Sequence, residues 1–350
     1  MKHDNIYINS IKQISVQQPL VDDWFERPLF YSEPYVRVLE PDYKQFFTPN
    51  EARRLGKILK RALLVSRQVI SESGLPAAIV TGTGLGCIEN SEIFLDKLVR
   101  EGEELLNPTH FMQSTHNTIS SIVAIDAKCH AYNTTYAHNG ISFECALQDA
   151  FMQLKTNKIK TALVGAHDEM TPSYFSLLKK AGYLGKPNQS FAGETAVAMM
   201  LATEKSEKTL CEIKAVEKFY TGYCSYAFGH QPTAFDSLRI KSAMTDKIDY
   251  IMTGINGDIE NDKIYHENCA KLFPNIPLLH YKNIFGESYT AAAFGVYAAA
   301  VSLQRAEIPK HLFLQQPEDR SKELKQFNKI LCYNHFEGKN HTFVLLSKQS

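Results

Sequence analysis

The stretch NTTYAHNGISFECALQDA, residues 133–150, passes from a strand-like opening through a small-residue corner into a helix-like run. The opening NTTY has good strand propensity, and the run SFECALQDA lacks glycine and proline. Several enzyme classes hold a nucleophile at such a corner, because a helix N-terminus lowers the pKa of a thiol. Here the corner reads AHNG, residues 137–140, and the nearest cysteine, Cys145, lies further along the expected helix.

Length and charge limit the classes of protein to consider. The chain has 350 residues, of which 44% are apolar and 22% are charged, as is usual for globular proteins. Its formal net charge is zero, so we expect no nucleic-acid partner. The sequence contains no run of about 18 consecutive apolar residues and no signal-peptide pattern at its start, so we expect no membrane span.

The seven cysteines are scattered along the chain and form no CxxC pair. We therefore expect reduced thiols in a cytoplasmic protein, most of them buried as small apolar side chains. None of the twelve histidines forms a short-spaced set with cysteine, so the sequence predicts no metal site. No cofactor is expected either.

The run AAIVTGTGLG, residues 77–86, predicts a buried strand that ends in a glycine-rich turn. Its GxGxG spacing differs from the GxGxxG of dinucleotide-binding turns, and Asp96 comes too early to contact a ribose. We therefore expect these glycines to allow tight backbone turning beside a packed helix. Further strand-then-helix units at 161–169 and 249–257 predict an α/β fold with a largely parallel sheet.

The chain is loosely self-similar when it is divided near residue 208. Each part contains an apolar strand with a glycine-rich turn, a helix rich in small residues and a late pair of strands. We therefore predict two similar halves, residues 1–208 and 209–350, with no low-complexity linker between them.

Six motifs, in this order, resemble the β-ketoacyl synthase branch of the thiolase superfamily over about residues 75–348. The resemblance implies the thiolase-like α/β fold, in which two similar βαβαβ-type halves form a layered α-β-α-β-α core. The motifs are GTGLG at 82–86, HNTISSIVAI at 116–125, TALVGAHDEMTP at 161–172, GETAVAMML at 193–201, KNIFGESYTAAAFG at 282–295 and NHFEGKNHTFVLL at 334–346.

Condensing enzymes of this family need a cysteine thiolate at the corner, and two histidines, or a histidine and an asparagine, to hold a developing enolate oxygen. The position of this cysteine corresponds here to His138, Asn139 or Gly140. Three residues are candidates because a small difference in length leaves the register open. Thr253 stands where the first histidine is expected, and Glu287 follows the glycine that precedes the second. A carboxylate beside a developing oxyanion would oppose the chemistry. The resemblance therefore implies that all three catalytic groups are replaced.

The first functional interpretation is a non-catalytic subunit. The motif STHNTISS at 114–121 and the missing corner cysteine most resemble the ketosynthase-like partners, of chain-length-factor type, in aryl polyene and flexirubin-type pathways. The resemblance implies a subunit that shapes an acyl pocket beside an active ketosynthase in polyene or fatty-acid-type biosynthesis, because the depth of an apolar cavity limits the chain that fits. Candidates for lining or gating this pocket are Phe111, Met112, His116, Ser142, Phe143, Lys282, Phe285 and Phe336.

The second interpretation is an enzyme with altered chemistry on the same fold, either an acyltransferase or a thioester hydrolase. It would use His138 as a base with Ser142 or a water molecule, and Asn139 or backbone amides would hold an oxyanion. Catalytic triads assemble in space from distant segments, so the order of residues leaves this alternative open. Whether the chain is an enzyme therefore also stays open.

Pairing with another chain is expected from the resemblance. The family pairs through the strand before the corner, about residues 128–137 here, which implies a heterodimer with an active ketosynthase or a homodimer. An acyl carrier protein is a further candidate partner. The helix expected after residue 48 has a basic side, which either lies in solvent or contacts an acidic partner. Its basic residues are Arg53, Lys57, Lys60, Arg61 and Arg67.

Overall fold

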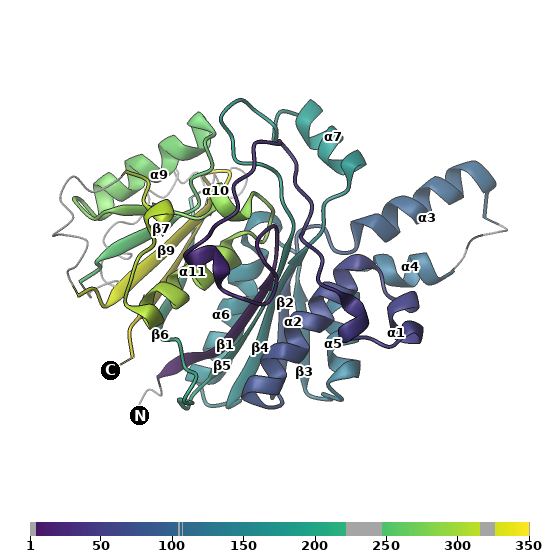
Figure 1. Cartoon of the computed structure of the whole chain (residues 1–350), viewed down its shortest axis with the longest axis horizontal. Helices are drawn as coiled ribbons and strands as arrows, with labels where there is room; N and C mark the ends of the chain where they lie inside the picture. The colour runs from purple at the N-terminus through teal and green to yellow at the C-terminus, as the bar shows by residue number, and fades with distance from the viewer. Residues whose placement is uncertain (1–4, 104–105, 107, 222–246, 316–325, 350) are drawn as a thin grey trace, which may run out of the picture.

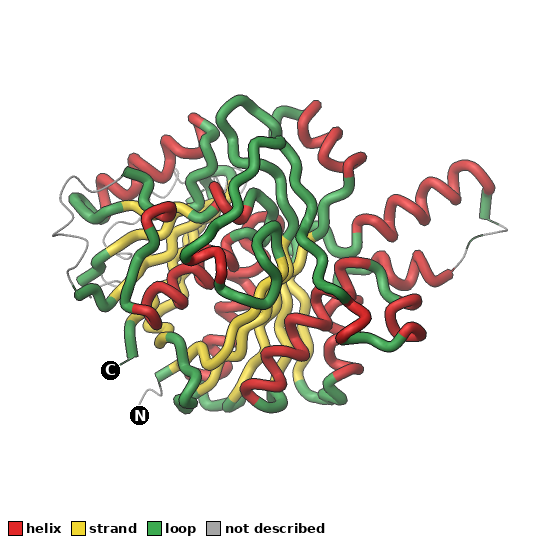
Figure 2. The backbone as a smooth tube through the Cα atoms, in the orientation of Figure 1, coloured by secondary structure: helices red, strands yellow, loops and turns green. Residues whose placement is uncertain are grey.

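The computed structural model of the chain describes residues 5–103, 106, 108–221, 247–315 and 326–349. Ten strands form one sheet in the order β3-β2-β4-β5-β1-β6-β10-β9-β7-β8, and Figure 2 shows this sheet crossing the molecule. The strands are β1 (Ile6–Ile14), β2 (Ala78–Gly82), β3 (Tyr132–Tyr136), β4 (Thr161–Asp168), β5 (Thr195–Ala202), β6 (Cys211–Tyr220), β7 (Tyr250–Thr253), β8 (Leu278–His280), β9 (Lys329–Phe336) and β10 (Asn340–Ser347).

The order of the strands repeats between the two halves of the chain. From one edge of the sheet inward the order is β3-β2-β4-β5-β1, and from the other edge inward it is β8-β7-β9-β10-β6. Each half therefore places its first to fifth strands in equivalent positions, which confirms the two similar halves of the predicted fold. The halves join where β1 pairs antiparallel with β6, with Ile8 opposite Cys211. The division at residue 208 falls just before β6 and stays a prediction.

Helices lie on both faces of the sheet and between its two halves (Figure 1). Helices α6 and α11 contact each other at the centre of the molecule, α2 and α5 cover the outer face of the first half, and α9 covers the outer face of the second. The helices are α1 (Pro49–Arg54), α2 (Lys57–Ser73), α3 (Ile88–Glu101), α4 (Pro108–Ser114), α5 (Thr118–Asp126), α6 (Ser142–Lys155), α7 (Pro172–Lys180), α9 (Ile259–Leu272), α10 (Lys282–Phe285) and α11 (Ala292–Arg305).

Most of the strands bury both of their faces, with successive side chains pointing to opposite sides of the strand, whereas the edge strand β3 is partly exposed. In β4, Ala162 and Val164 pack in the central apolar cluster with α6 and α11, whereas Leu163 packs in the outer cluster with α2. In β9, Ile330 packs centrally and Leu331 packs toward α9. The molecule thus has the predicted α-β-α-β-α layers. Among the described residues, no helix combines the length and apolar character that a membrane crossing requires.

The basic helix face differs from the prediction at Arg61. This side chain lies on the inner side of α2, buried, where its guanidinium pairs with Glu40 at 2.6 Å and with Glu194 at 3.0 Å. The prediction that Arg61 belongs to a basic surface is therefore wrong, because two carboxylates stabilise the buried charge. Arg67 is also paired, with Asp126 at 2.6 Å.

Candidate functional site

The corner that follows β3 is held by the hydroxyl of Ser142. A 3-10 turn, Asn139–Ile141, connects the strand to α6, and Asn139 has a positive φ of 49°. The buried Ser142 Oγ accepts a hydrogen bond from the backbone N–H of His138 at 2.7 Å and donates to the carbonyl of Asn139 at 2.8 Å. The His138 and Asn139 residues are exposed. The corner residues 137–140 include no thiol, and the nearby hydroxyl stabilises the turn.

Phe336 closes the corner at Gly140. A side chain on Gly140 would begin 2.4 Å from Cδ2 of the Phe336 ring, which is closer than real Cβ contacts allow. The carbonyl of Gly140 accepts a hydrogen bond from Nδ2 of Asn334 at 3.1 Å, which fixes the corner against β9. Position 140 therefore has no space for a nucleophilic side chain unless the phenyl ring moves.

Cys145 is the cysteine closest in sequence to the corner, and it is buried in α6. Burial raises the pKa of its thiol, and the nearby charge and hydrogen bond of Lys218 oppose this shift. The sulfur accepts a hydrogen bond from Nζ of Lys218 at 3.2 Å. Because the thiolate is the nucleophilic form, a raised pKa and burial favour a packing role for Cys145.

The two expected histidine positions hold groups that are engaged in structural contacts. Thr253, at the end of β7, is fully buried, and its hydroxyl donates to the carbonyl of Leu279 in β8 at 2.8 Å. Oε2 of Glu287 lies 2.7 Å from Nζ of Lys282 and accepts a hydrogen bond from Nδ2 of Asn256 at 2.7 Å. The Lys282 and Glu287 side chains are only 8% and 16% exposed, so this is a mostly buried ion pair.

The glycine turn after β2 binds a carboxylate of the chain itself. One oxygen of the buried Asp168 accepts hydrogen bonds from the backbone N–H groups of Gly84 at 2.8 Å and Leu85 at 3.0 Å, and from the hydroxyl of Thr83 at 3.0 Å. Its other oxygen accepts from the hydroxyl of Thr290, just before α11, at 2.7 Å. The turn thus fixes the end of β4 to the central helix. Sequence reasoning missed Asp168, although the motif TALVGAHDEMTP contains it.

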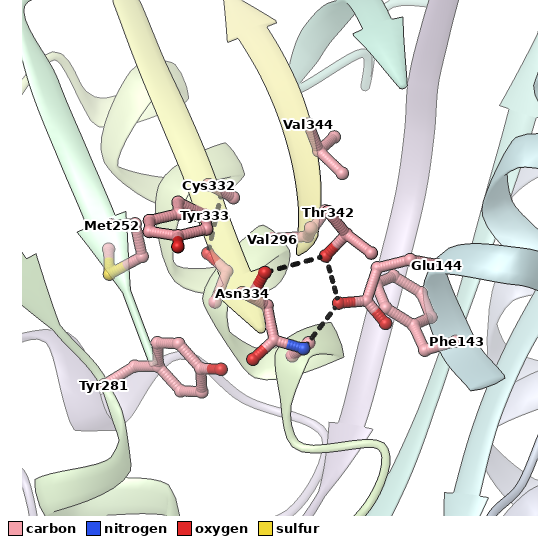
Figure 3. A pocket seen from close by; sticks show the side chains of 12 residues that line it. Phe143, Glu144, Met252, Tyr281, Val296, Cys332, Tyr333, Asn334, Thr342 and Val344 are labelled. Carbon is pink, nitrogen blue, oxygen red and sulfur yellow. Dashed lines mark hydrogen bonds between the residues drawn. The ribbon is translucent and has the colours of Figure 1, made fainter. Parts of the chain in front are cut away.

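A small cavity lies behind the corner, lined by apolar side chains together with polar groups of Glu144, Tyr281, Asn334 and Thr342 (Figure 3). Its volume is about 10 Å³, which is the space of roughly one water molecule. Glu144 of α6 is buried there, and its Oε1 accepts from Nδ2 of Asn334 at 2.7 Å and from Oγ1 of Thr342 at 2.8 Å. Burial raises the pKa of Glu144, and these two hydrogen bonds act in the opposite direction. The cavity is too small for an acyl chain.

The predicted pocket candidates do not gather in one described cavity. Phe143 lines the small cavity, Lys282 pairs with Glu287, and Ser142 and Phe336 lie at the corner. Phe285 is buried in the core, stacked on Phe294 with 4.6 Å between ring centroids. Three candidates are exposed: Phe111 and Met112 on α4, and His116.

No group of three histidine, cysteine, aspartate or glutamate side chains in the described residues could hold a metal ion.

Comparison with known proteins identifies the family. Residues 33–242, more than half of the chain, match the family model described as "Beta-ketoacyl synthase, N-terminal domain". The chain belongs to the β-ketoacyl synthase family. The resemblance predicted from the motifs is therefore confirmed. No curated protein sequence matches the chain.

Solved structures of this family share the fold at low sequence identity. "The ishigamide ketosynthase/chain length factor" is 15% identical, with a TM-score of 0.78 and coverage of 99% of this chain and 100% of that chain. "Ketosynthase (ApeO) in Complex with its Chain Length Factor (ApeC) from Xenorhabdus doucetiae" is 15% identical, with a TM-score of 0.75 and coverage of 99% and 98%. A β-ketoacyl synthase from Burkholderia phymatum STM815 is 12% identical, with a TM-score of 0.76 and coverage of 99% and 100%. These structures confirm the thiolase-like fold class.

Proposed function

We propose that the chain is a non-catalytic, chain-length-factor-type subunit that shapes an acyl pocket beside an active ketosynthase. One observation carries the proposal: the residues that the resemblance assigns to the three catalytic positions make structural contacts. Ser142 and the tight contact between Gly140 and Phe336 fix the corner, Thr253 bonds to a backbone carbonyl, and Glu287 pairs with a buried lysine.

The electrostatics of the second histidine position support this role. A condensing enzyme stabilises negative charge on an enolate oxygen, and hydrogen-bond donors must point at it. Here the Glu287 carboxylate already takes the donors from Lys282 and Asn256, and its own negative charge would repel the enolate. Restoring a cysteine alone would therefore not create a synthase.

The small interior cavity supports an acyl pocket that is shared with a partner. The cavity behind the corner has space for about one water molecule, and under this proposal the acyl chain occupies space to which a second subunit contributes. Phe336, half-buried at the corner, is the candidate for gating this shared pocket.

The edge strand β3 is the proposed place of pairing. It lies at one end of the sheet, and in the described part of the chain it pairs with β2 alone. Its free edge presents unpaired backbone groups that a partner strand could bind. Two large apolar side chains nearby are exposed, Tyr132 at 42% and Ile125 at 76%. The proposed partner is a cysteine-bearing ketosynthase or a second copy, with an acyl carrier protein as the source of acyl groups in an aryl polyene, flexirubin or fatty-acid-type pathway.

The alternative proposal is an acyltransferase or thioester hydrolase with altered chemistry. The exposure of His138 at the corner favours it, because an exposed imidazole can act as a base. The proposed role of Ser142 is the weaker part of this alternative, since its buried hydroxyl already donates to the Asn139 carbonyl.

Intact-protein mass spectrometry tests the proposal. The purified chain is incubated with acyl-loaded carrier protein, alone and together with a cysteine-bearing ketosynthase from the same source. We expect the acyl mass to appear on the ketosynthase and never on this chain. An acylated form of this chain would favour the enzyme. Release of free acid by this chain without the ketosynthase would favour it too, if His138→Ala abolishes that release.

A further inference from the structure

The turn that joins β9 to β10, residues 337–339, directly follows Phe336, whose ring closes the corner. This ring lies against Gly140 and is tilted on the ring of Tyr289, with 6.2 Å between the ring centroids. The turn is tight, because the backbone N–H of Lys339 donates to the carbonyl of Phe336 at 3.1 Å. The position of the ring over the corner therefore depends on this turn.

Two buried histidines, His335 and His341, hold the tip of the turn at Gly338. Nδ1 of His335 accepts a hydrogen bond from the backbone N–H of Gly338 at 3.3 Å. Nε2 of His341 donates to the carbonyl of Gly338 at 3.1 Å, and the hydroxyl of Thr221 donates to the same carbonyl at 3.1 Å. A side chain at Gly338 would begin 2.8 Å from Cδ1 of Ile264, so the tip also lies directly against α9. Side chains thus bind both polar backbone groups at the tip.

The same two histidines attach the turn to the structure around it. Nε2 of His335 donates to the carbonyl of Asn261 in α9 at 3.1 Å. Nδ1 of His341 accepts from the hydroxyl of Tyr333 in β9 at 2.9 Å, and this hydroxyl accepts from Nδ2 of Asn268 in α9 at 2.8 Å. The turn therefore moves away from α9 only if hydrogen bonds of both imidazoles break.

These partners require each imidazole to be neutral and to hold its proton on Nε2. A carbonyl oxygen only accepts, so Nε2 of both rings carries a proton, and the N–H of Gly338 only donates, so Nδ1 of His335 carries none. Burial lowers the pKa of His335 to about 3 and that of His341 to about 4, which keeps both rings neutral near pH 7. Each ring thus uses both of its nitrogens.

Asn334 connects the first of these histidines to the corner. Its Nδ2 donates to the carbonyl of Gly140 at 3.1 Å, and its Oδ1 accepts from the hydroxyl of Tyr265 at 3.0 Å. The oxygen of the same hydroxyl accepts from the backbone N–H of His335 at 3.2 Å. A continuous set of hydrogen bonds therefore joins the corner, the end of β9 and the turn.

We propose that His335 and His341 form a latch on the β9–β10 turn, which keeps the Phe336 ring over Gly140 and makes this ring a fixed wall of the shared acyl pocket. The role in the pocket rests on the proposed function, whereas the latch on the turn does not. The two histidines are positioning residues, because they act through the ring. A wall that stays in one place gives the pocket one depth and so favours one length of acyl chain.

Amide hydrogen exchange of peptides that cover residues 336–341, measured by mass spectrometry, tests the latch. His335→Leu removes the acceptor for the Gly338 N–H, and we expect exchange in the turn to become about tenfold faster. His335→Asn keeps an acceptor close to the position of Nδ1 and should restore most of the protection. His167→Leu, at a buried histidine of β4, is the matched control and should leave this exchange unchanged. Unchanged exchange in His335→Leu, or equal acceleration in the control, would overturn the latch.

The cost of Gly140→Ala shows whether the latch positions the ring. Gly140 does not have a positive φ, and the three atoms nearest to an added Cβ all belong to Phe336. We expect Gly140→Ala to lower the midpoint of thermal unfolding, and to lower it by less than half as much in the His335→Leu background, where the ring can move. An equal decrease in the two backgrounds would overturn the positioning role. If His335→Leu does not fold, His341→Asn replaces it in both measurements, because it removes the donor to the Gly338 carbonyl.

Reconstitution with a cysteine-bearing ketosynthase separates the latch from the proposed function. With the wild-type chain we expect one dominant length of product, and with His335→Leu a broader distribution of lengths at the same total rate. If the wild-type chain does not support the ketosynthase, the proposed function fails, and hydrogen exchange still decides whether the latch exists. An unchanged distribution from a variant whose turn exchanges faster would overturn the role of the ring as a wall.

Discussion

The ion pair between Lys282 and Glu287 provides a quantitative test of the proposal that Glu287, at the expected position of the second histidine, has a structural role. The two side chains are 8% and 16% exposed, and their charged atoms lie 2.7 Å apart. Removing one partner of a buried pair leaves an uncompensated charge and costs about 3–5 kcal/mol of unfolding free energy. We expect Glu287→Leu to fall in this range. Lys282→Met should cost less, because Asn256 still donates to the remaining carboxylate.

The double variant Lys282→Met/Glu287→Leu should be more stable than the sum of the two single effects implies. Directly contacting residues have coupling energies of about 0.5–3 kcal/mol, and burial places this pair near the upper end. Unfolding in urea, followed for all four proteins of the double-mutant cycle, measures the coupling. The exposed pair Lys57–Glu89, whose side chains are 52% and 37% exposed, is a matched control with expected coupling below about 1 kcal/mol. A coupling at Lys282–Glu287 no larger than at the control would refute the structural role.

Three further predictions concern buried groups around the site. Asp168→Ala should lower the free energy of unfolding by about 3–6 kcal/mol, because it leaves four hydrogen-bond donors without their acceptor. Asp168→Asn keeps one oxygen as an acceptor and should lower it by less than half as much. Unfolding in urea measures both variants. Burial raises the pKa of Glu169 to about 7, so its contribution to stability is present below pH 4.5 and is lost as the pH rises through 7. When the pH is lowered from 7 to 5, the free energy of unfolding of the wild type should therefore rise by about 2 kcal/mol more than that of Glu169→Gln. An equal change in the two proteins would contradict the raised pKa. The thiol of Cys145 should resist alkylation by iodoacetamide at neutral pH in the folded chain and react after unfolding. Peptide mass spectrometry measures the labelling. Rapid labelling in the folded state would show a reactive thiol.

The fold could be predicted from the sequence because its main signals are local. The alternation of apolar strands and helices indicated the α/β class, and the motifs indicated two similar halves, which the repeated strand order shows. The prediction of a largely parallel sheet is wrong, because five of the nine pairings between the described strands are antiparallel. The strand-to-helix corner was predicted at residues 137–140, and the structure has β3 ending at Tyr136, a 3-10 turn at Asn139–Ile141 and α6 beginning at Ser142.

The contacts of the site could not be predicted because they join residues that are distant in sequence. Glu144 contacts Thr342 across 198 positions, and Asp168 contacts Thr290 across 122. Aromatic and apolar residue types were also poor guides to a pocket: Phe285 packs in the core, whereas Phe111 is 57% exposed on α4. A single residue type on a helix does not specify whether its side chain faces a cavity, the core or solvent.

Product formation during reconstitution tests the central claim most directly. A cysteine-bearing ketosynthase from the same source is titrated with this chain in the presence of acyl-loaded and malonyl-loaded carrier protein, and the condensed product is measured. We expect no product from this chain alone, and a rate that rises with added chain and saturates at one copy per ketosynthase. Condensed product from this chain alone, at a rate unchanged when the ketosynthase is left out, would contradict the account.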